Sequence, residues 1–127
     1  MITKNDWKTV SMPTNKSELG FNIVFSNADA EKLLCGYKPV DMEDKWFVYS
    51  DNNWVYFIRS WTGHYIFGIE LSDVLDGKLV VTSSWVNADT KQYRTQGREQ
   101  DCRLLSGIIK GKFGVVGTPN KSLNRDS

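Results

Sequence analysis

A period-two pattern of β-favouring residues between positions 45 and 86 restricts the fold of this chain more than any other feature. Four segments show it: KWFVYS (45–50), WVYFIRSW (54–61), HYIFGIELS (64–72) and KLVVTSSWV (78–86). Successive side chains of a strand point to opposite faces, so this pattern predicts consecutive β-strands. The connections suit tight turns and are DNN (51–53), TG (62–63) and DG (76–77). We therefore predict a series of antiparallel hairpins.

Helical signals lie on either side of these strands. SNADAEKLLCG (26–36) offers Ser26 or Asn27 as an N-cap and Gly36 as a stop. REQDCRLLSGIIKGKF (98–113) should dock an apolar stripe on the sheet. The residues of this segment at helical spacing are Asp101, Leu104, Leu105, Ile108 and Lys112.

These elements predict one α+β domain over residues 1–127. We expect a twisted antiparallel sheet of about five strands, a short N-terminal helix, and a C-terminal helix packed on one face. FNIVFS (21–26) is a further strand. Residues 1–20 should form an irregular lead-in with one short strand, and residues 118–127 should form a polar tail.

Composition is typical of a soluble globular domain, with 40% hydrophobic and 24% charged residues. The chain has no apolar run long enough to span a membrane and no apolar segment of a secretory signal near Met1. Cys35 and Cys102 are therefore expected to be reduced, partly buried thiols of a cytoplasmic protein. Two cysteines and one histidine cannot complete the usual zinc site without carboxylates, so we predict no metal and no cofactor.

The net charge of +1 argues against a general nucleic-acid-binding protein. Charge is nevertheless uneven, because residues 91–127 carry eight Lys or Arg against three Asp or Glu. Such a segment could contact an acidic partner or support self-association, although a solvated helix face is the commoner explanation.

Hairpin register sorts the central strands into two faces. A two-residue turn at Asn52–Asn53 sets Trp46 opposite Arg59, and a two-residue turn at TG sets Trp61 opposite His64. One face is then nearly all apolar and should be the core under a helix. Its residues are Phe47, Tyr49, Trp54, Tyr56, Ile58, Tyr65, Phe67, Ile69 and Leu71. The opposite face is mixed, with Trp46, Val48, Phe57, Arg59, Trp61, His64, Ile66, Gly68 and Glu70.

The mixed face suggests a binding site made of Trp46, Arg59, Trp61 and His64. Arg59 between two indoles can form a cation–π stack, and it can also bind an anionic group while a tryptophan stacks on a flat ring. A small anionic or aromatic ligand, such as a nucleotide, fits this chemistry. The alternatives are a protein-binding surface, and burial between helices with Arg59 paired to Glu70 or Asp44.

An enzyme is the competing hypothesis, because His64 is the one residue whose ordinary pKa lies near neutrality. It would need a carboxylate partner, for which Glu43, Asp44 and Glu70 are the candidates. No nucleophile motif or phosphate-binding loop accompanies it, so a hydrolase- or transferase-like activity is the less favoured interpretation.

MEDKWFVY (42–49) and RSWTG (59–63) resemble a group of short, mostly uncharacterised bacterial proteins. VNADTKQYR (86–94) and DCRLLSGII (101–109) resemble the polar loop and closing helix of that group, and the likeness covers about residues 25–113. It implies a fold and no established activity. Members of the group often have a second histidine two residues before the arginine. This chain has Phe57 there, which places any acid–base role tied to that position in doubt.

The ending TPNKSLNRDS (118–127) resembles the C-terminus of proteins encoded by integron gene cassettes. That likeness implies an accessory, mobile bacterial gene with an adaptive or defence role. A generic polar tail is the alternative. An ordered polar tail would need a surface to lie against, and a second copy of the chain would provide one, which favours a homodimer.

Overall fold

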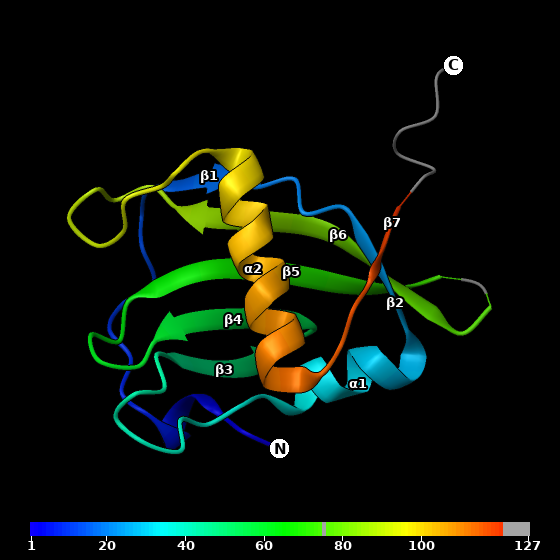
Figure 1. The fold of residues 1–127 in the computed structure, drawn as a ribbon, viewed down its shortest axis with the longest axis horizontal. Helices are drawn as coiled ribbons and strands as arrows, with labels where there is room; N and C mark the ends of the chain where they lie inside the picture. The colour runs from blue at the N-terminus through cyan, green and yellow to red at the C-terminus, as the bar shows by residue number, and fades with distance from the viewer. Residues whose placement is uncertain (75, 121–127) are drawn as a thin grey trace.

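The computed structural model describes residues 1–74 and 76–120 and has a single antiparallel sheet with helices packed against it (Figure 1). Its elements follow in chain order. They are η1 (Lys4–Asp6), β1 (Lys16–Glu18), β2 (Ile23–Ser26), α1 (Asn27–Cys35), β3 (Trp46–Asp51), β4 (Trp54–Arg59), β5 (Tyr65–Val74), β6 (Lys78–Asn87), α2 (Arg98–Phe113) and β7 (Thr118–Pro119). The sheet runs β3-β4-β5-β6-β2-β7, and β1 pairs with the other half of the β6 edge that β2 occupies.

The predicted α+β class is confirmed, but the described residues form seven strands rather than about five. The two additional strands are too short to produce a periodic pattern. β1 has three residues and is the short strand expected in the lead-in, whereas β7 has two residues and opens the predicted polar tail. Residues 121–127 of that tail lie outside the described residues.

Both predicted helices form over the expected residues. Ser26 caps α1, since its Oγ accepts a hydrogen bond from the Asp29 backbone N–H at 3.1 Å. Gly97 and Gly114 flank α2, and both adopt positive φ angles that suit glycine. The apolar stripe of α2 differs from the predicted one, because Leu104 is exposed and Ile109 is buried in its place.

The first central hairpin has the predicted register and the second does not. Asn52 and Asn53 form the first turn with positive φ angles, which pairs Trp46 with Arg59. The second turn has four residues, Ser60–Gly63, since the Arg59 backbone N–H donates to the His64 carbonyl at 3.0 Å. Trp61 therefore does not face His64.

A β-bulge follows this longer turn and exchanges the faces of β5. Ile58 pairs with Tyr65 while Phe57 pairs with Phe67, so Ile66 is an additional residue in β5. From Phe67 onward the side chains of β5 therefore lie on the face opposite to the predicted one. Periodicity alone carries no signal for such an insertion.

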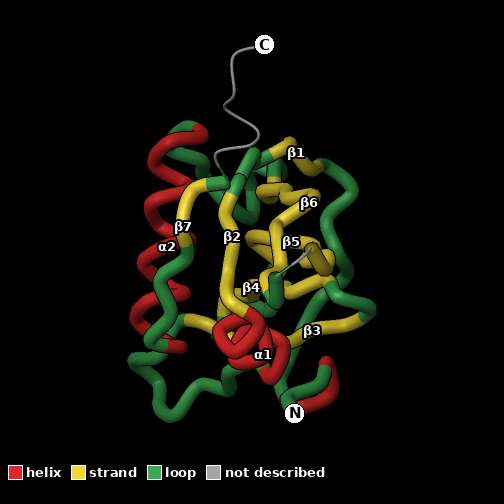
Figure 2. Tube along the Cα trace, turned by 90° about the vertical axis from the view of Figure 1, so that its right-hand side faces the viewer, coloured by secondary structure: helices red, strands yellow, loops and turns green. Residues whose placement is uncertain are grey.

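The larger core lies under the helices, on the face that the sequence suggested was mixed (Figure 2). This face combines Trp46, Val48 and Phe57 with side chains from β5, and α2 crosses it with Leu105, Ile108 and Ile109. The predicted core face carries a smaller, aromatic cluster instead. Its buried residues are Phe47, Tyr49, Ile58, Tyr65 and Trp85.

The lead-in covers that aromatic cluster, which explains why both faces of the sheet are apolar. Ile2 and Trp7 pack against it. The Ile2 backbone N–H donates to the Cys35 carbonyl at 2.8 Å, and the Val10 N–H donates to the Gly63 carbonyl at 2.9 Å. The first ten residues thus form part of the packed structure and connect α1 to the turn after β4.

Both cysteines are free thiols, but Cys35 is exposed where a partly buried side chain was expected, and Cys102 is half-buried. Burial raises the pKa of the Cys102 thiol, which makes it a poor nucleophile. Within the described ranges, no helix combines the length and apolar character that crossing a membrane requires.

Candidate functional site

A hollow of about 310 Å³ lies at the end of the sheet where β3 begins and β4 ends. We call it the cationic hollow, because two positively charged side chains line it and no acidic one does. Its lining residues are Lys45, Arg59, Ser60, Trp61, Thr62 and Gln92. Two of the four predicted binding residues, Arg59 and Trp61, therefore lie here.

Arg59 stacks on Trp46, as the sequence suggested. Its Cζ lies 4.8 Å from the centroid of the Trp46 ring, which is itself stacked on Phe67 at 6.2 Å. Trp46 is buried, so it supports the guanidinium from below and is not a direct ligand contact. In the part of the chain that the structure describes, no hydrogen bond or ion pair involves the Arg59 side chain, and the expected pairing with Asp44 or Glu70 does not form.

Trp61 is 65% exposed and lies beside the cationic hollow without stacking on Arg59. Its position is nevertheless fixed, because its ring Nε1–H donates to the Met42 carbonyl at 2.9 Å. The Lys8 ammonium also donates to the Trp61 carbonyl. A large exposed aromatic side chain held in one orientation offers a stacking surface at low entropic cost.

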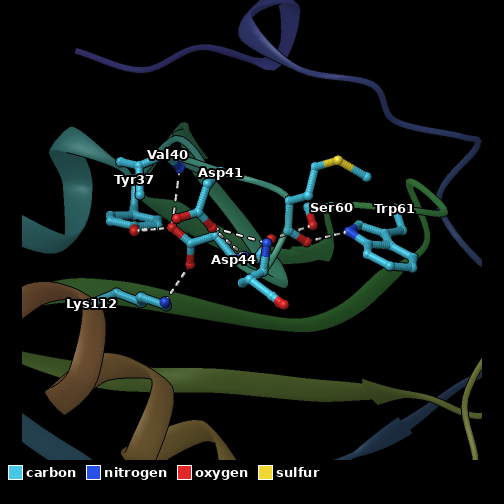
Figure 3. A network of polar contacts seen from close by, with 9 residues as sticks. Tyr37, Val40, Asp41, Asp44, Ser60, Trp61 and Lys112 are labelled. Atoms are coloured by element: carbon cyan, nitrogen blue, oxygen red, sulfur yellow. Dashed lines mark hydrogen bonds and ion pairs between the residues drawn. The ribbon is translucent and has the colours of Figure 1, made fainter.

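Ser60 anchors the turn that carries Trp61 (Figure 3). Its backbone N–H donates to the Lys45 carbonyl at 2.9 Å, and its Oγ donates to the Asp44 carbonyl at 2.7 Å. The Trp7 indole N–H donates to the Ser60 carbonyl at 2.8 Å. The residues before β3 and the turn after β4 are thus held together, which fixes the backbone on which the two cationic side chains of the hollow stand.

Asp44 is part of this support rather than of a catalytic pair. Its carboxylate is buried and accepts hydrogen bonds from the Tyr37 hydroxyl, the Lys112 ammonium and the Val40 backbone N–H (Figure 3). Burial alone would raise the pKa of Asp44, but these donors outweigh it and the pKa lies below its ordinary value. The bond from Tyr37 to this carboxylate raises the pKa of the tyrosine to about 12.

His64 is half-buried at the end of the same turn, and none of the candidate carboxylates reaches it. Among the described residues, no hydrogen bond or ion pair joins its imidazole to a carboxylate. Glu70 lies opposite Trp54 in the sheet. It follows His64 by six residues, which places it about 20 Å from His64 at the usual strand rise. Glu43 is exposed in the loop before β3.

Lys45 and Gln92 complete the hollow and were not predicted from the sequence. Gln92 lines the hollow, and its Oε1 accepts a hydrogen bond from the Asn87 side chain at 2.8 Å, a bond that does not use the amide N–H groups of Gln92. Tyr93 holds the same loop against α2, since its hydroxyl donates to the buried Asp101 carboxylate at 2.6 Å. Both bonds are local, spanning five and eight residues, but only the fold brings Gln92 beside Arg59. From the sequence, the adjacency of Lys45 to Trp46 could have suggested one of the two residues.

In the described ranges, no three His, Cys, Asp or Glu side chains are grouped so that they could hold a metal ion. No protein-family model, curated protein or solved structure matches this chain. The geometry of the hollow is therefore the main guide to function.

Proposed function

We propose that this chain is a non-enzymatic binding protein for a small anionic ligand that carries a flat ring, and that the cationic hollow is its site. One observation carries the proposal. Arg59 is held on Trp46 with no acidic partner among the described residues, next to Lys45 and to the exposed ring of Trp61. A cation that is positioned but not neutralised by the fold is suited to neutralise a ligand.

The donors around the hollow match an anion. Arg59 and Lys45 contribute charged N–H groups, and the Gln92 amide and Thr62 hydroxyl add neutral donors. The volume of the hollow is at the lower end of the range of roughly 300–1,000 Å³ that small-molecule sites occupy. Trp61 supplies the face on which a flat ring can stack, so a nucleotide or an ADP-ribose derivative suits the site.

An enzyme that uses His64 remains the second candidate and has less support. A general base needs the proton that it abstracts and its orienting group within hydrogen-bonding reach. Among the described residues the imidazole has no such carboxylate, and Asp44 is committed to Tyr37, Val40 and Lys112.

The proposal is tested by calorimetric titration of the wild-type chain and of Arg59→Met with adenosine monophosphate. We expect the substitution to weaken binding about 10- to 100-fold, the usual value of a hydrogen bond to a charged group. Arg103→Met is the matched control, because Arg103 is exposed on α2 and pairs with Glu99 away from the hollow. Equal affinity of Arg59→Met and wild type would refute the proposal.

The cellular setting is a separate proposal, supported by the resemblances of the sequence alone. We propose a cytoplasmic protein of a bacterium, encoded on a mobile integron cassette. Sequencing the DNA that flanks the gene tests it. A cassette recombination site directly after the reading frame is expected, and its absence would contradict this origin.

A further inference from the structure

A second hollow, of about 640 Å³, lies on the other side of Trp61. Its walls are largely apolar and include Trp7, Pro39, Val40 and Met42. Ser60 and Trp61 line both hollows, so the two are neighbours separated by a single turn. We call this one the apolar hollow.

The apolar side chains of this hollow are unusually accessible. Val40 and Met42 are each 78% exposed, and Trp61 is 65% exposed. Single exposed apolar residues are common on protein surfaces, but a group of them around one concave site marks a place where apolar surface is bound. The backbone that carries this group is held in position, because the Met42 carbonyl accepts the indole hydrogen bond of Trp61 and the Val40 N–H donates to the Asp44 carboxylate.

The two hollows differ in charge. Lys45 and Arg59 line the first with no acid beside them. Lys8 and Asp41 line the second and carry opposite charges, so its charge is balanced. A ligand that crosses Trp61 would therefore meet a cationic site at one end and an apolar, neutral site at the other.

We infer that the ligand is an amphipathic anion, whose charged head lies in the cationic hollow and whose apolar arm crosses Trp61 into the apolar hollow. This inference rests on the proposed function, to which it adds the second half of the ligand. Charge complementarity selects the occupant. The head neutralises Arg59 and Lys45, and the arm removes Val40, Met42 and Trp61 from water.

Straight-chain carboxylates test the inference, with butanoate, hexanoate and octanoate as probes. Binding is followed by NMR through the indole N–H signal of Trp61, which is assigned with Trp61→Phe. We expect the affinity to rise about fourfold for each added methylene, the usual value of burying that group. Alkyl phosphates of the same lengths should show the same slope, and whichever series binds more tightly identifies the head group.

The double substitution of Val40→Ser with Met42→Ser separates the contribution of the ligand's arm to the affinity from that of its head. Both side chains are exposed, so the fold should tolerate the change. We expect this variant to bind butanoate as the wild type does but to lose the gain with chain length, whereas Arg59→Met should weaken every member equally. Hexan-1-ol, which lacks the charge, should bind much more weakly than hexanoate.

Three results would overturn the inference: no slope in the wild type, an undiminished slope in the double variant, or equal binding of hexan-1-ol and hexanoate. Failure of the proposed function looks different. If adenosine monophosphate binds and Arg59→Met abolishes that binding while the alkyl series shows no slope, only the amphipathic ligand is excluded. If Arg59→Met leaves the affinity for butanoate and the nucleotide unchanged, the cationic hollow is excluded as the binding site.

Discussion

Lys112 and Arg59 are two cations placed against aromatic rings, and they differ in whether the fold gives them an acidic partner. The Lys112 Nζ lies 5.3 Å from the centroid of Tyr37, and the Arg59 Cζ lies 4.8 Å from that of Trp46. Lys112 also bonds the buried carboxylate of Asp44. Arg59 has no acidic partner in the described part of the chain and faces a hollow.

The contrast has a physical basis. A buried carboxylate loses its hydration, so Asp44 requires a counterion and additional donors within the fold. Lys112, Tyr37 and Val40 supply them. Arg59 is only half-buried and keeps access to water, so its charge needs no partner from the protein. Lys112 therefore belongs to the structure, while Arg59 retains a charge that a ligand can use.

Asp44→Asn should give the largest loss of stability. The substitution keeps the shape of the side chain but leaves Lys112 without its counterion, and we expect the free energy of unfolding to fall by about 3 kcal/mol. Urea denaturation followed by circular dichroism measures it. Lys110→Met is the control, because that exposed lysine lies on the same helix without an ion pair. A loss no greater than that of the control would show that the pair is not structural.

Stability should also depend on pH through this network. The pKa of Asp44 is lowered in the folded state, so its contribution is present above its ordinary pKa of 3.8 and is lost as the pH falls further. The pKa of Tyr37 is raised from 10.0 to about 12, so its contribution is present below pH 10 and is lost as the pH rises through about 12.

Denaturation curves from pH 2 to 12 check both limbs. Asp44→Asn should flatten the acid limb relative to wild type. Tyr37→Phe should remove part of the alkaline loss, the remainder belonging to other buried tyrosines such as Tyr49 and Tyr93, whose pKa values burial also raises. Arg59→Met should follow the acid limb of the wild type, and a changed acid limb would mean that Arg59 belongs to the network of Asp44.

Arg59→Met should have the smallest effect on stability. It removes a partly exposed cation–π contact, which is usually worth about 1 kcal/mol, and it leaves no buried charge unpaired. Urea denaturation should therefore show a loss well below that of Asp44→Asn. A loss of equal size would make Arg59 a structural cation like Lys112 and would remove the basis of the proposed site.

Local signals in the sequence located much of this fold. The Ser26 cap of α1 and the asparagines of the first turn fix backbone conformations within a few residues, so α1 and the pairing of Trp46 with Arg59 could be predicted. The stack of Arg59 on Trp46 followed from that register. Its counterpart on Trp61 did not form, because the longer second turn directs that indole to Met42.

The remaining features depend on contacts between distant segments. The bulge at Ile66 exchanged the faces of β5. Trp7 covers the aromatic cluster on the second face of the sheet, but it lies in a stretch without periodicity, so the sequence did not indicate this contact. The sequence offered Asp44 as one of several candidate partners for Arg59 or His64. Its actual partner, Lys112, lies 68 residues away, and only the assembled fold brings them together.

The attachment of the first residues to the turn after β4 has a practical consequence. Trp7 and Lys8 each bond the backbone of the turn that presents Trp61, and Val10 bonds Gly63 at its end. A shortened version that begins at β1 would lack the layer over Tyr49 and Tyr65 as well as three hydrogen bonds to that turn. Trimming of this stretch in protein engineering would thus alter the binding surface itself, and fusion partners are better joined through a spacer that leaves Ile2 in place.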